Sequence, residues 1–263
     1  MKRPLDADDF YDRLAADYHL VYENWDGSIE RQSAVLGTLL GASLSGGSAR
    51  VLDCACGIGT QAIGMARMGC RVTATDISRR AVRRAGIELR KRNLRPERLL
   101  VADMRKLPAE FDGCFDAVVC CDNPLAHLLV EEDLLAAFRC MHAALRAGGQ
   151  VLTSSRDYDA ILVSRPSQTP VRTGSDNRGV TAAFQLWHWD KDDPIYTSEH
   201  FVLRRGLSGW KVRHLVTRMR AWGRADIASA AREAGFREVE WKTPEQSGYF
   251  QPVMTAFRAN SGG

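Results

Sequence analysis

The sequence predicts an α/β protein built on a mostly parallel sheet that helices cover on both faces. Apolar runs typical of strands alternate with helical segments from about residue 49 to residue 156. Such alternation, with runs that are apolar at nearly every position, is typical of a parallel sheet buried on both sides. Three successive runs end in acids, Asp53, Asp76 and Asp103. Because parallel strands bind ligands at their carboxyl ends, we expect a doubly wound sheet that gathers these carboxylates at its binding edge.

The first strand breaks into a glycine-containing turn and then a helix. Gly57 and Gly59 allow positive φ and a close approach of the backbone to a ligand, and the amides of the following helix point into the same crevice. This turn predicts a site for a nucleotide-type cofactor. It is not the phosphate-binding loop of kinases and ATPases, because Thr60-Gln61-Ala62 stands where a Lys-Ser/Thr pair is required.

Two cofactor classes fit the turn. A dinucleotide-binding fold is compatible with Gly57-x-Gly59-x-x-Ala62 followed by an acid such as Asp76. An NAD-dependent oxidoreductase therefore stays as an alternative. Asp53, four residues before Gly57, favours S-adenosyl-L-methionine, because a carboxylate suits its cationic amino group better than a pyrophosphate. A binding module without catalysis is the third possibility.

Composition narrows the class of protein. With 263 residues and 45% apolar content, the chain is long enough for one large α/β domain with an embellishment. We expect a cytoplasmic protein without a membrane partner, because no run approaches the roughly 18 apolar residues of a span and no N-terminal apolar region indicates export. The net charge of +4 is too small to predict a nucleic-acid partner. The seven cysteines are expected to be reduced core residues, with no metal site.

The N-terminal region is predicted to be helical. Residues 8 to 25 form a segment whose Tyr11, Tyr18 and Tyr22 share one face, either as a stripe that packs on the domain or as a lid over the cofactor. A second helix follows with Arg31 near its start, and residues 43 to 48 link it to the first strand.

The central elements follow in order. The second strand covers residues 71 to 75, and Ser78 is placed to cap the next helix, whose basic residues are interpreted as a solvated face. The third strand, residues 98 to 102, ends at Asp103 and Met104, a polar acceptor and an apolar side chain suited to adenine. The fourth strand, residues 115 to 121, delivers Asn123 to the binding edge. A long helix runs to about Arg146, and a fifth strand, residues 150 to 155, delivers Arg156 to the same edge.

After residue 156 the pattern changes. Residues 180 to 189, 195 to 205 and 210 to 221 are strand-like runs separated by turns, which predicts an antiparallel meander. A helix over 226 to 234 and strands over 237 to 242 and near 250 to 258 complete the chain. We therefore expect four parts: an N-terminal helical lid (1–48), a cofactor-binding core (49–156), a substrate-side insertion (157–223) and a C-terminal completion of the sheet (224–263).

These motifs resemble the class I S-adenosylmethionine-dependent methyltransferases and, more narrowly, the glycine/sarcosine N-methyltransferase group. The general motifs cover roughly residues 50 to 155. The narrower resemblance rests on the run Val51 to Thr60, on Asn123 with Ala126-His127-Leu128, on residues 156 to 162 and on Tyr249. It implies a Rossmann-like, seven-stranded methyltransferase sheet with an antiparallel insertion after strand five, and S-adenosyl-L-homocysteine as the cofactor product.

The resemblance also implies roles for particular residues. Asn123 and Arg156 match the residues that hold the carboxylate of the amino-acid substrate, Tyr249 is a further substrate contact, and Tyr11 and Tyr22 would orient the methyl group and the acceptor. The residues expected at the cofactor are Tyr22, Arg31 (reaching the cofactor carboxylate), Asp53, Ala55, Gly57, Gly59, Asp76, Ile77, Asp103, Met104 and Cys121.

The chain departs from the group at several positions. Pro124-Leu125 replaces Ser-Phe, and only Tyr196 matches the several tyrosines of the group's meander. We therefore expect a small-molecule acceptor with a carboxylated or polar amine, which need not be glycine. Asn123-Pro124 half-matches a nucleobase N-methyltransferase motif, so N- or O-methylation of a nucleobase-like or natural-product molecule is the alternative.

Two smaller questions stay open in the sequence. His127 is either a proton acceptor or a structural residue. Arg156 either grips the acceptor or pairs with Asp157 or Asp159 to hold its own loop.

Overall fold

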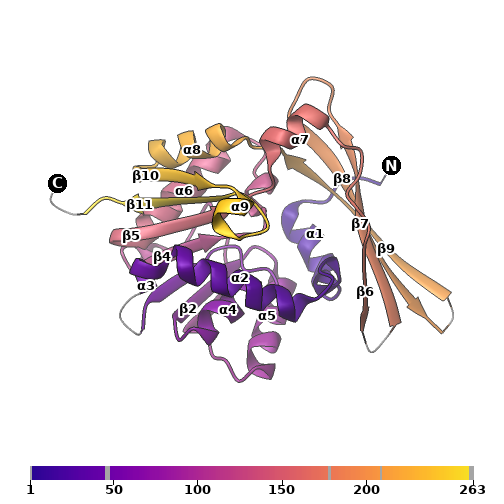
Figure 1. The fold of residues 1–263 in the computed structure, drawn as a ribbon, viewed down its shortest axis with the longest axis horizontal. Helices are drawn as coiled ribbons and strands as arrows, with labels where there is room; N and C mark the ends of the chain where they lie inside the picture. The colour runs from indigo at the N-terminus through magenta and orange to yellow at the C-terminus, as the bar shows by residue number, and fades with distance from the viewer. Residues whose placement is uncertain (1, 45–47, 177–178, 208, 261–263) are drawn as a thin grey trace.

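The computed structural model describes residues 2–44, 48–176, 179–207 and 209–260, and these form two sheets (Figure 1). The larger sheet has seven strands in the order β10-β11-β5-β4-β1-β2-β3. Its strands are β1 (Arg50–Asp53), β2 (Arg71–Asp76), β3 (Arg98–Val101), β4 (Phe115–Cys120), β5 (Leu145–Ser154), β10 (Phe236–Lys242) and β11 (Val253–Arg258). β1 to β5 pair in parallel, whereas β11 runs antiparallel to both β5 and β10. The predicted fold class is confirmed.

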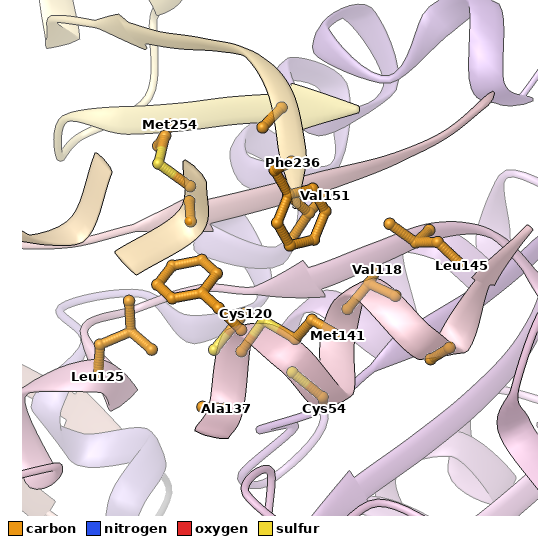
Figure 2. Close-up of a cluster of buried hydrophobic side chains, with 14 of the residues drawn as sticks. Cys54, Val118, Cys120, Leu125, Ala137, Met141, Leu145, Val151, Phe236 and Met254 are labelled. Carbon is orange, nitrogen blue, oxygen red and sulfur yellow. The ribbon is translucent and has the colours of Figure 1, made fainter. Parts of the chain in front are cut away.

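Helices cover both faces of this sheet. On one face lie α6 (Glu131–Ala144) and α8 (Arg224–Glu233), and on the other lie α2 (Trp25–Leu39), α4 (Thr60–Arg67) and α5 (Arg79–Lys91) (Figure 1). Figure 2 shows the core beneath α6, where Val118 and Cys120 of β4 and Val151 of β5 lie among the side chains of Met141 and Phe236. Because strands buried between two helical layers need apolar residues on both faces, the continuous apolar runs follow from this arrangement.

The antiparallel meander is confirmed, with one strand more than expected. β7 (Gly179–Trp189), β8 (Ile195–Gly206) and β9 (Gly209–Arg220) pair in sequence, and β6 (Arg172–Asp176) adds an edge strand that the sequence did not indicate. The helix α7 (Tyr158–Ser164) joins this sheet to β5. Across the described ranges, no helix has both the length and the apolar character needed to cross a membrane.

The N-terminal segment differs from the single helix predicted for residues 8 to 25. It consists of α1 (Ala7–Leu14) and a 3₁₀ turn, η1 (Tyr18–Val21), and Trp25 already begins α2. Asn24 ends the segment because its extended backbone and its side chain, which accepts a hydrogen bond from the Gly27 amide at 2.9 Å, cap α2. The short helix α3 (Gly41–Leu44) follows α2.

Other boundaries were also misjudged. α6 ends at Ala144 rather than near Arg146, and β5 begins at Leu145 because that residue pairs with Phe115 of β4. The glycines at 148 and 149 therefore lie inside β5, in the irregular stretch where the register with β4 shifts between Leu145 and Gln150, and Gly148 has a φ of 71°. The last strand begins at Val253, after the helical turn α9 (Pro244–Ser247). The short helical turns η2 (Ala109–Phe111) and η3 (Pro124–His127) flank β4.

The helix α1 lies between the two sheets (Figure 1). Its Phe10 and Leu14 are fully buried against Ala183, Val202 and Leu215 of the antiparallel sheet. On the other side, Asp12 Oδ1 accepts hydrogen bonds from the Ser78 hydroxyl at 2.6 Å and from the Arg80 amide at 2.9 Å. An acidic side chain thus satisfies a free amide at the N-terminus of α5 and fixes α1 to the larger sheet.

We predict that Asp12→Ala weakens this attachment by about 1 kcal/mol, the usual contribution of a helix cap. Urea unfolding should show a free energy of unfolding that is lower by this amount. Hydrogen exchange should be faster in residues 7–14 and in the first turn of α5. Asp9→Ala removes an exposed acid from the same helix and is the matched control. Equal effects of the two substitutions would contradict the capping role.

Candidate active site

A cavity of about 560 Å³ lies where the carboxyl edge of the larger sheet meets the N-terminal segment and the antiparallel sheet. The predicted site residues that line it are Tyr11, Tyr22, Asn123 and Arg156. Tyr18 and Asp122 also line it, and its far wall includes Gln185, Trp187 and His200. Elements from four parts of the chain therefore build one chamber.

The glycine turn adopts the predicted conformation beside Asp76. Gly57 and Gly59 have φ of 52° and 99°, in the left-handed region that favours glycine. The Gly57 amide donates to Asp76 Oδ2 and the Ser78 amide donates to Asp76 Oδ1, both at 2.8 Å. Burial nevertheless raises the pKa of Asp76 to about 6. Each carboxylate oxygen can accept a second hydrogen bond, so Asp76 can still receive hydroxyl groups of a ligand.

Asp53 is a buried carboxylate whose charge the described residues compensate only weakly. It is 1% exposed, and neither oxygen makes a hydrogen bond of normal geometry to a described group. Burial raises its pKa to about 8, the nearby amides of Ala55 and Ala62 lower it in part, and the charges of Asp76 and Asp122 raise it further. A cationic ligand group next to Asp53 would supply the missing compensation.

The third acid is held differently. Arg105 Nη2 lies 2.6 Å from Asp103 Oδ2, and the Arg105 amide donates to Asp103 Oδ1 at 2.9 Å. Partial burial opposes ionisation of Asp103, but these bonds from Arg105 prevail and lower its pKa. Of the other expected cofactor contacts, Ala55, Ile77 and Met104 are half-buried near the ends of β1, β2 and β3, and Cys121 is buried at the end of β4.

These residues fit the methyl donor. The weakly compensated Asp53 suits the amino group of the donor. The glycine turn lets the donor approach the protein backbone closely, and Asp76 can accept hydrogen bonds from its ribose hydroxyls. None of these residues lines the cavity, however, because the Tyr18 ring packs over the turn: a Cβ at Gly57 would lie 3.3 Å from Tyr18 Cε1. The N-terminal segment therefore covers the cofactor-binding edge.

The three N-terminal tyrosines meet without sharing a helix. The rings of Tyr11 and Tyr18 are 5.6 Å apart, and those of Tyr18 and Tyr22 are 6.3 Å apart. Burial is the main cause that raises the pKa of each phenol well above its usual value, so all three stay protonated at neutral pH. The Tyr11 hydroxyl lies 2.9 Å from His127 Nε2, and burial and then the Arg156 charge lower the pKa of His127 to about 4. His127 is thus a neutral partner of Tyr11.

Arg31 lies on the exposed face of α2, and its contact with the cofactor stays a prediction. Its side chain is exposed on α2 and donates to Ser28 Oγ at 3.2 Å, outside the residues that line the cavity. The next residue, Gln32, faces inward instead, with Oε1 2.6 Å from Gln61 Nε2 and 2.8 Å from the Tyr249 hydroxyl. A one-residue step along a helix turns a side chain by about 100°, which separates the two positions.

Tyr249 lies behind the cavity wall rather than in it. It is 2% exposed, and its hydroxyl is 2.8 Å from Asp122 Oδ1 as well as from Gln32 Oε1. Its single proton can serve only one of these acceptors at a time. Tyr249 thus supports a cavity residue instead of facing the cavity directly.

Asn123 and Arg156 are brought together as predicted. The Arg156 amide and the Ser155 hydroxyl donate to Asn123 Oδ1 at 3.3 and 3.2 Å. The Asn123 Nδ2 donates to the Tyr158 hydroxyl at 3.0 Å, and that oxygen lies 2.9 Å from the Tyr196 hydroxyl. This buried chain links the ends of β4 and β5 to the antiparallel sheet, so the orientation of Asn123 depends on both sheets.

The Arg156 side chain reaches across to the antiparallel sheet. Its guanidinium lies 4.8 Å from the centre of the Trp187 ring, and Nη2 donates to Gln185 Oε1 at 3.1 Å. Asp159 instead binds Arg224 Nε at 2.5 Å, and Asp157 lies 4.0 Å from the same guanidinium. The alternative in which Arg156 pairs with Asp157 or Asp159 is therefore not what the structure shows.

Asp122 and His200 are among the cavity residues that the sequence analysis did not identify. Asp122 follows β4 as the other acids follow β1, β2 and β3, so a fourth strand-ending acid was a signal that could have been used. His200 lies opposite Gln185 in the β7–β8 pair, with Nε2 buried and unpartnered among the described groups. Whether His200 faces the cavity depends on which face of β8 packs against α1. No local sequence pattern reveals that packing.

Comparisons with known proteins show which families this chain resembles. Residues 51–149 match the methyltransferase domain family. A glycine/sarcosine N-methyltransferase of Parasynechococcus marenigrum is 34% identical over 131 residues, which cover 50% of this chain and 45% of that protein. The chain spans about half the length of the curated relatives it matches. The predicted resemblance to S-adenosylmethionine-dependent methyltransferases, and to the glycine/sarcosine group within them, is confirmed.

Solved structures share the fold over nearly the whole chain. A S-adenosylmethionine-dependent methyltransferase from Clostridium acetobutylicum superposes with a TM-score of 0.73 at 17% identity, covering 95% of this chain and 99% of that one. The amino pentose methyltransferase CalS10 from Micromonospora echinaspora, solved with S-adenosylmethionine bound, gives 0.71 at 19% identity, covering 93% and 95%. Both contain the insertion as well as the core, since they cover so much of the chain.

The weakly compensated Asp53 predicts opposite effects on stability and on binding. Its pKa rises from 3.8 to about 8 on folding, so the folded protein holds a proton that the unfolded chain releases, and stability falls as pH increases between these values. Asp53→Asn should remove this share of the pH dependence and stabilise the ligand-free protein at pH 8.5 by on the order of a few kcal/mol. Denaturant unfolding at pH 6 and pH 8.5 measures it.

The same variant should bind S-adenosyl-L-homocysteine roughly tenfold more weakly or worse in calorimetric titration, because the ligand ammonium loses a charged partner. A variant that is unaltered in both stability and affinity would remove Asp53 from the site.

The cover over the glycine turn predicts that residues 8 to 22 move when the cofactor enters. Tyr18 must leave Gly57 for a ligand to reach the turn and then close again over it. Hydrogen exchange should show protection rising in this segment when S-adenosyl-L-homocysteine is added, whereas β7–β9 should change little. Equal protection with and without ligand would indicate a plain packing segment.

Proposed function

We propose that this chain, which carries a methyltransferase domain over residues 51–149, transfers a methyl group from S-adenosyl-L-methionine to the nitrogen of a small amine. The acceptor in this proposal also bears a carboxylate or another strongly polar group. The observation that carries it is the convergence of Arg156 and Asn123 at the cavity, with 3.3 Å between the Arg156 amide and Asn123 Oδ1.

The relatives support a nitrogen acceptor. The curated relative at 34% identity is a glycine/sarcosine N-methyltransferase, and the structural neighbour CalS10 acts on an amino pentose. Asn123 and Arg156 match the positions that bind the substrate carboxylate in the first group. A guanidinium can grip a carboxylate through two parallel hydrogen bonds, and Arg156 has one terminal nitrogen already directed by Gln185.

The size of the cavity favours an acceptor larger than glycine. Its volume of about 560 Å³ falls within the range of roughly 300 to 1,000 Å³ found for sites of drug-sized ligands. Its wall combines apolar rings, such as Phe10 and Trp187, with the polar ends of Gln185 and His200. An amine that carries a sugar-like or aromatic body would use this wall, whereas glycine would leave it unused.

The residues of the chain mainly position and enclose the reactants. S-adenosyl-L-methionine, when bound, supplies a methyl group made electrophilic by its sulfonium. Arg156 and Asn123 would hold the polar end of the acceptor, while the protonated phenols of Tyr11 and Tyr22 would orient its reacting end by hydrogen bonds. The segment that carries these phenols also excludes water. His127, with a pKa of about 4, keeps Tyr11 in place and is a poor proton acceptor at neutral pH.

We predict that Arg156→Lys leaves affinity for S-adenosyl-L-homocysteine intact and lowers kcat/KM for a carboxylated amine by about 3 kcal/mol, or two powers of ten. Lysine keeps the charge but cannot form the two parallel bonds. Amines without the carboxylate should be poor substrates that the change hardly affects. Turnover of amines with and without a carboxylate, matched in size, measures both effects.

Arg165→Lys is the matched control for this experiment. Arg165 also lies over a tryptophan of the antiparallel sheet, 5.6 Å from the Trp189 ring centre, but it does not line the cavity. If Arg156→Lys affected charged and uncharged amines alike, or only lowered the melting temperature as Arg165→Lys would, Arg156 would be structural.

A further inference from the structure

Asp122 is a carboxylate that the fold holds firmly at the wall of the cavity. It lies two residues after the end of β4, and its amide donates to Ser154 Oγ at 2.9 Å. The Tyr22 hydroxyl donates to Oδ2 at 2.9 Å, and the Tyr249 hydroxyl lies 2.8 Å from Oδ1. Its φ of 70° is in the left-handed region, which aspartate tolerates better than most residues. The carboxylate is thus oriented by two elements far from it in sequence.

Among the described residues, no cationic side chain is paired with this carboxylate. Within the described part of the chain, no Lys, Arg or His side chain forms an ion pair with Asp122. The ionisable groups that face it are the phenols of Tyr18, Tyr22 and Tyr249, the Cys121 thiol and the Asp53 carboxyl. All of these are neutral or anionic.

Its tendency to take a proton follows from the same surroundings. Burial raises the pKa of Asp122, and hydrogen bonds from Tyr249, Tyr22, Gln61 and Gln32 lower it only in part. The raised pKa of each of these two phenols keeps its hydroxyl protonated. Both phenols therefore donate hydrogen bonds and carry no negative charge that could attract a cation. A cation that arrives in the cavity therefore finds one carboxylate with unused lone pairs and no competing partner.

We propose that Asp122 binds the ammonium group of the acceptor and takes from it the proton that must leave before methyl transfer. This inference rests on the proposed N-methyl transfer. An ammonium nitrogen has no free electron pair, so it cannot attack a methyl group until one N–H bond breaks. The bonding pair then stays on nitrogen, and the proton forms an O–H bond with Asp122, which later releases it to solvent.

The proposal also accounts for charge after the proton has moved. Once Asp122 has passed the proton to solvent it is a carboxylate again, so the positive charge that develops on nitrogen during methyl transfer forms beside an anion that the two phenols keep oriented. Arg156 lines the same cavity with the opposite charge. Together they define the acceptor class as a zwitterion larger than glycine, with its ammonium at the end of β4 and its anion at the end of β5.

Asp122→Asn tests this role with little effect on folding. Asparagine tolerates the left-handed backbone at least as well as aspartate, and its amide can still bond Tyr22 and Tyr249. Asp157→Asn is the matched control, because Asp157 also lines the cavity but caps α7 through the Ala160 amide at 3.3 Å, which asparagine can preserve.

Binding can be tested without turnover. Two probes carry the same carboxylated ring: 4-(aminomethyl)benzoate is an ammonium ion at pH 7, and 4-aminobenzoate has a neutral amino group. Calorimetric titration into the S-adenosyl-L-homocysteine complex should show the wild type binding the ammonium probe more tightly. Asp122→Asn should weaken that probe roughly tenfold or more and leave the neutral probe nearly unchanged, and Asp157→Asn should affect neither. Equal loss for both probes, or no preference in the wild type, would overturn the proposal.

Turnover adds a pH profile that a structural role would not produce. With the amine that the wild type methylates best, Asp122→Asn should lower kcat/KM about 100-fold at pH 7, and the loss should shrink roughly tenfold per pH unit as the free amine becomes available. A parallel loss at every pH, or a matching fall in S-adenosyl-L-homocysteine affinity, would assign Asp122 to structure or cofactor binding. If the wild type methylates no amine, the proposed function fails; if Asp122→Asn methylates amines normally, only the role of Asp122 fails.

Discussion

The concentration of carboxylates at one sheet edge is the constraint on which this structure depends. Four parallel strands end beside one another, and an acid follows or ends each of them, at Asp53, Asp76, Asp103 and Asp122. Desolvated carboxylates repel one another and resist ionisation, so each requires compensation by donors or by a cation. The groups that surround this edge supply that compensation.

The four acids are compensated in different ways. Backbone amides of the glycine turn and of α5 bind Asp76, the Arg105 guanidinium binds Asp103, and two phenols bind Asp122. Asp53 has no such partner, and its pKa rises to about 8 as a result. Asp53, on the cofactor side, is therefore the least compensated of the four, whereas Asp122, on the cavity side, has hydrogen bonds but no cationic partner among the described residues. The buried carboxylates thus lower the stability of the ligand-free protein at the edge of the sheet where ligands are expected to bind.

The N-terminal segment is the element that converts this edge into a chamber. It contributes Tyr22 to Asp122, covers the turn with Tyr18 and packs Phe10 and Leu14 against the antiparallel sheet. Its attachments are of two kinds. The apolar contacts join it to the antiparallel sheet, whereas Asp12 joins it to α5 through hydrogen bonds at the protein surface. Motion of the segment away from the turn would break the hydrogen bonds of Asp12 more easily than the apolar contacts with the antiparallel sheet.

The sequence by itself determined the layered sheet, the glycine turn and the three strand-ending acids, because periodicity, glycine spacing and strand order are local or nearly local properties. It also indicated Asn123 and Arg156, since both follow strands whose ends must meet. Only the tertiary structure decided that Arg31 faces solvent while Gln32 faces Asp122, that Tyr249 supports the cavity from behind, and that Gln185 and His200 form its far wall. These facts depend on the rotation of a helix by one residue and on which face of a distant sheet packs against α1. Such choices are made by packing between elements that are separated in the sequence, and no short stretch of sequence records them.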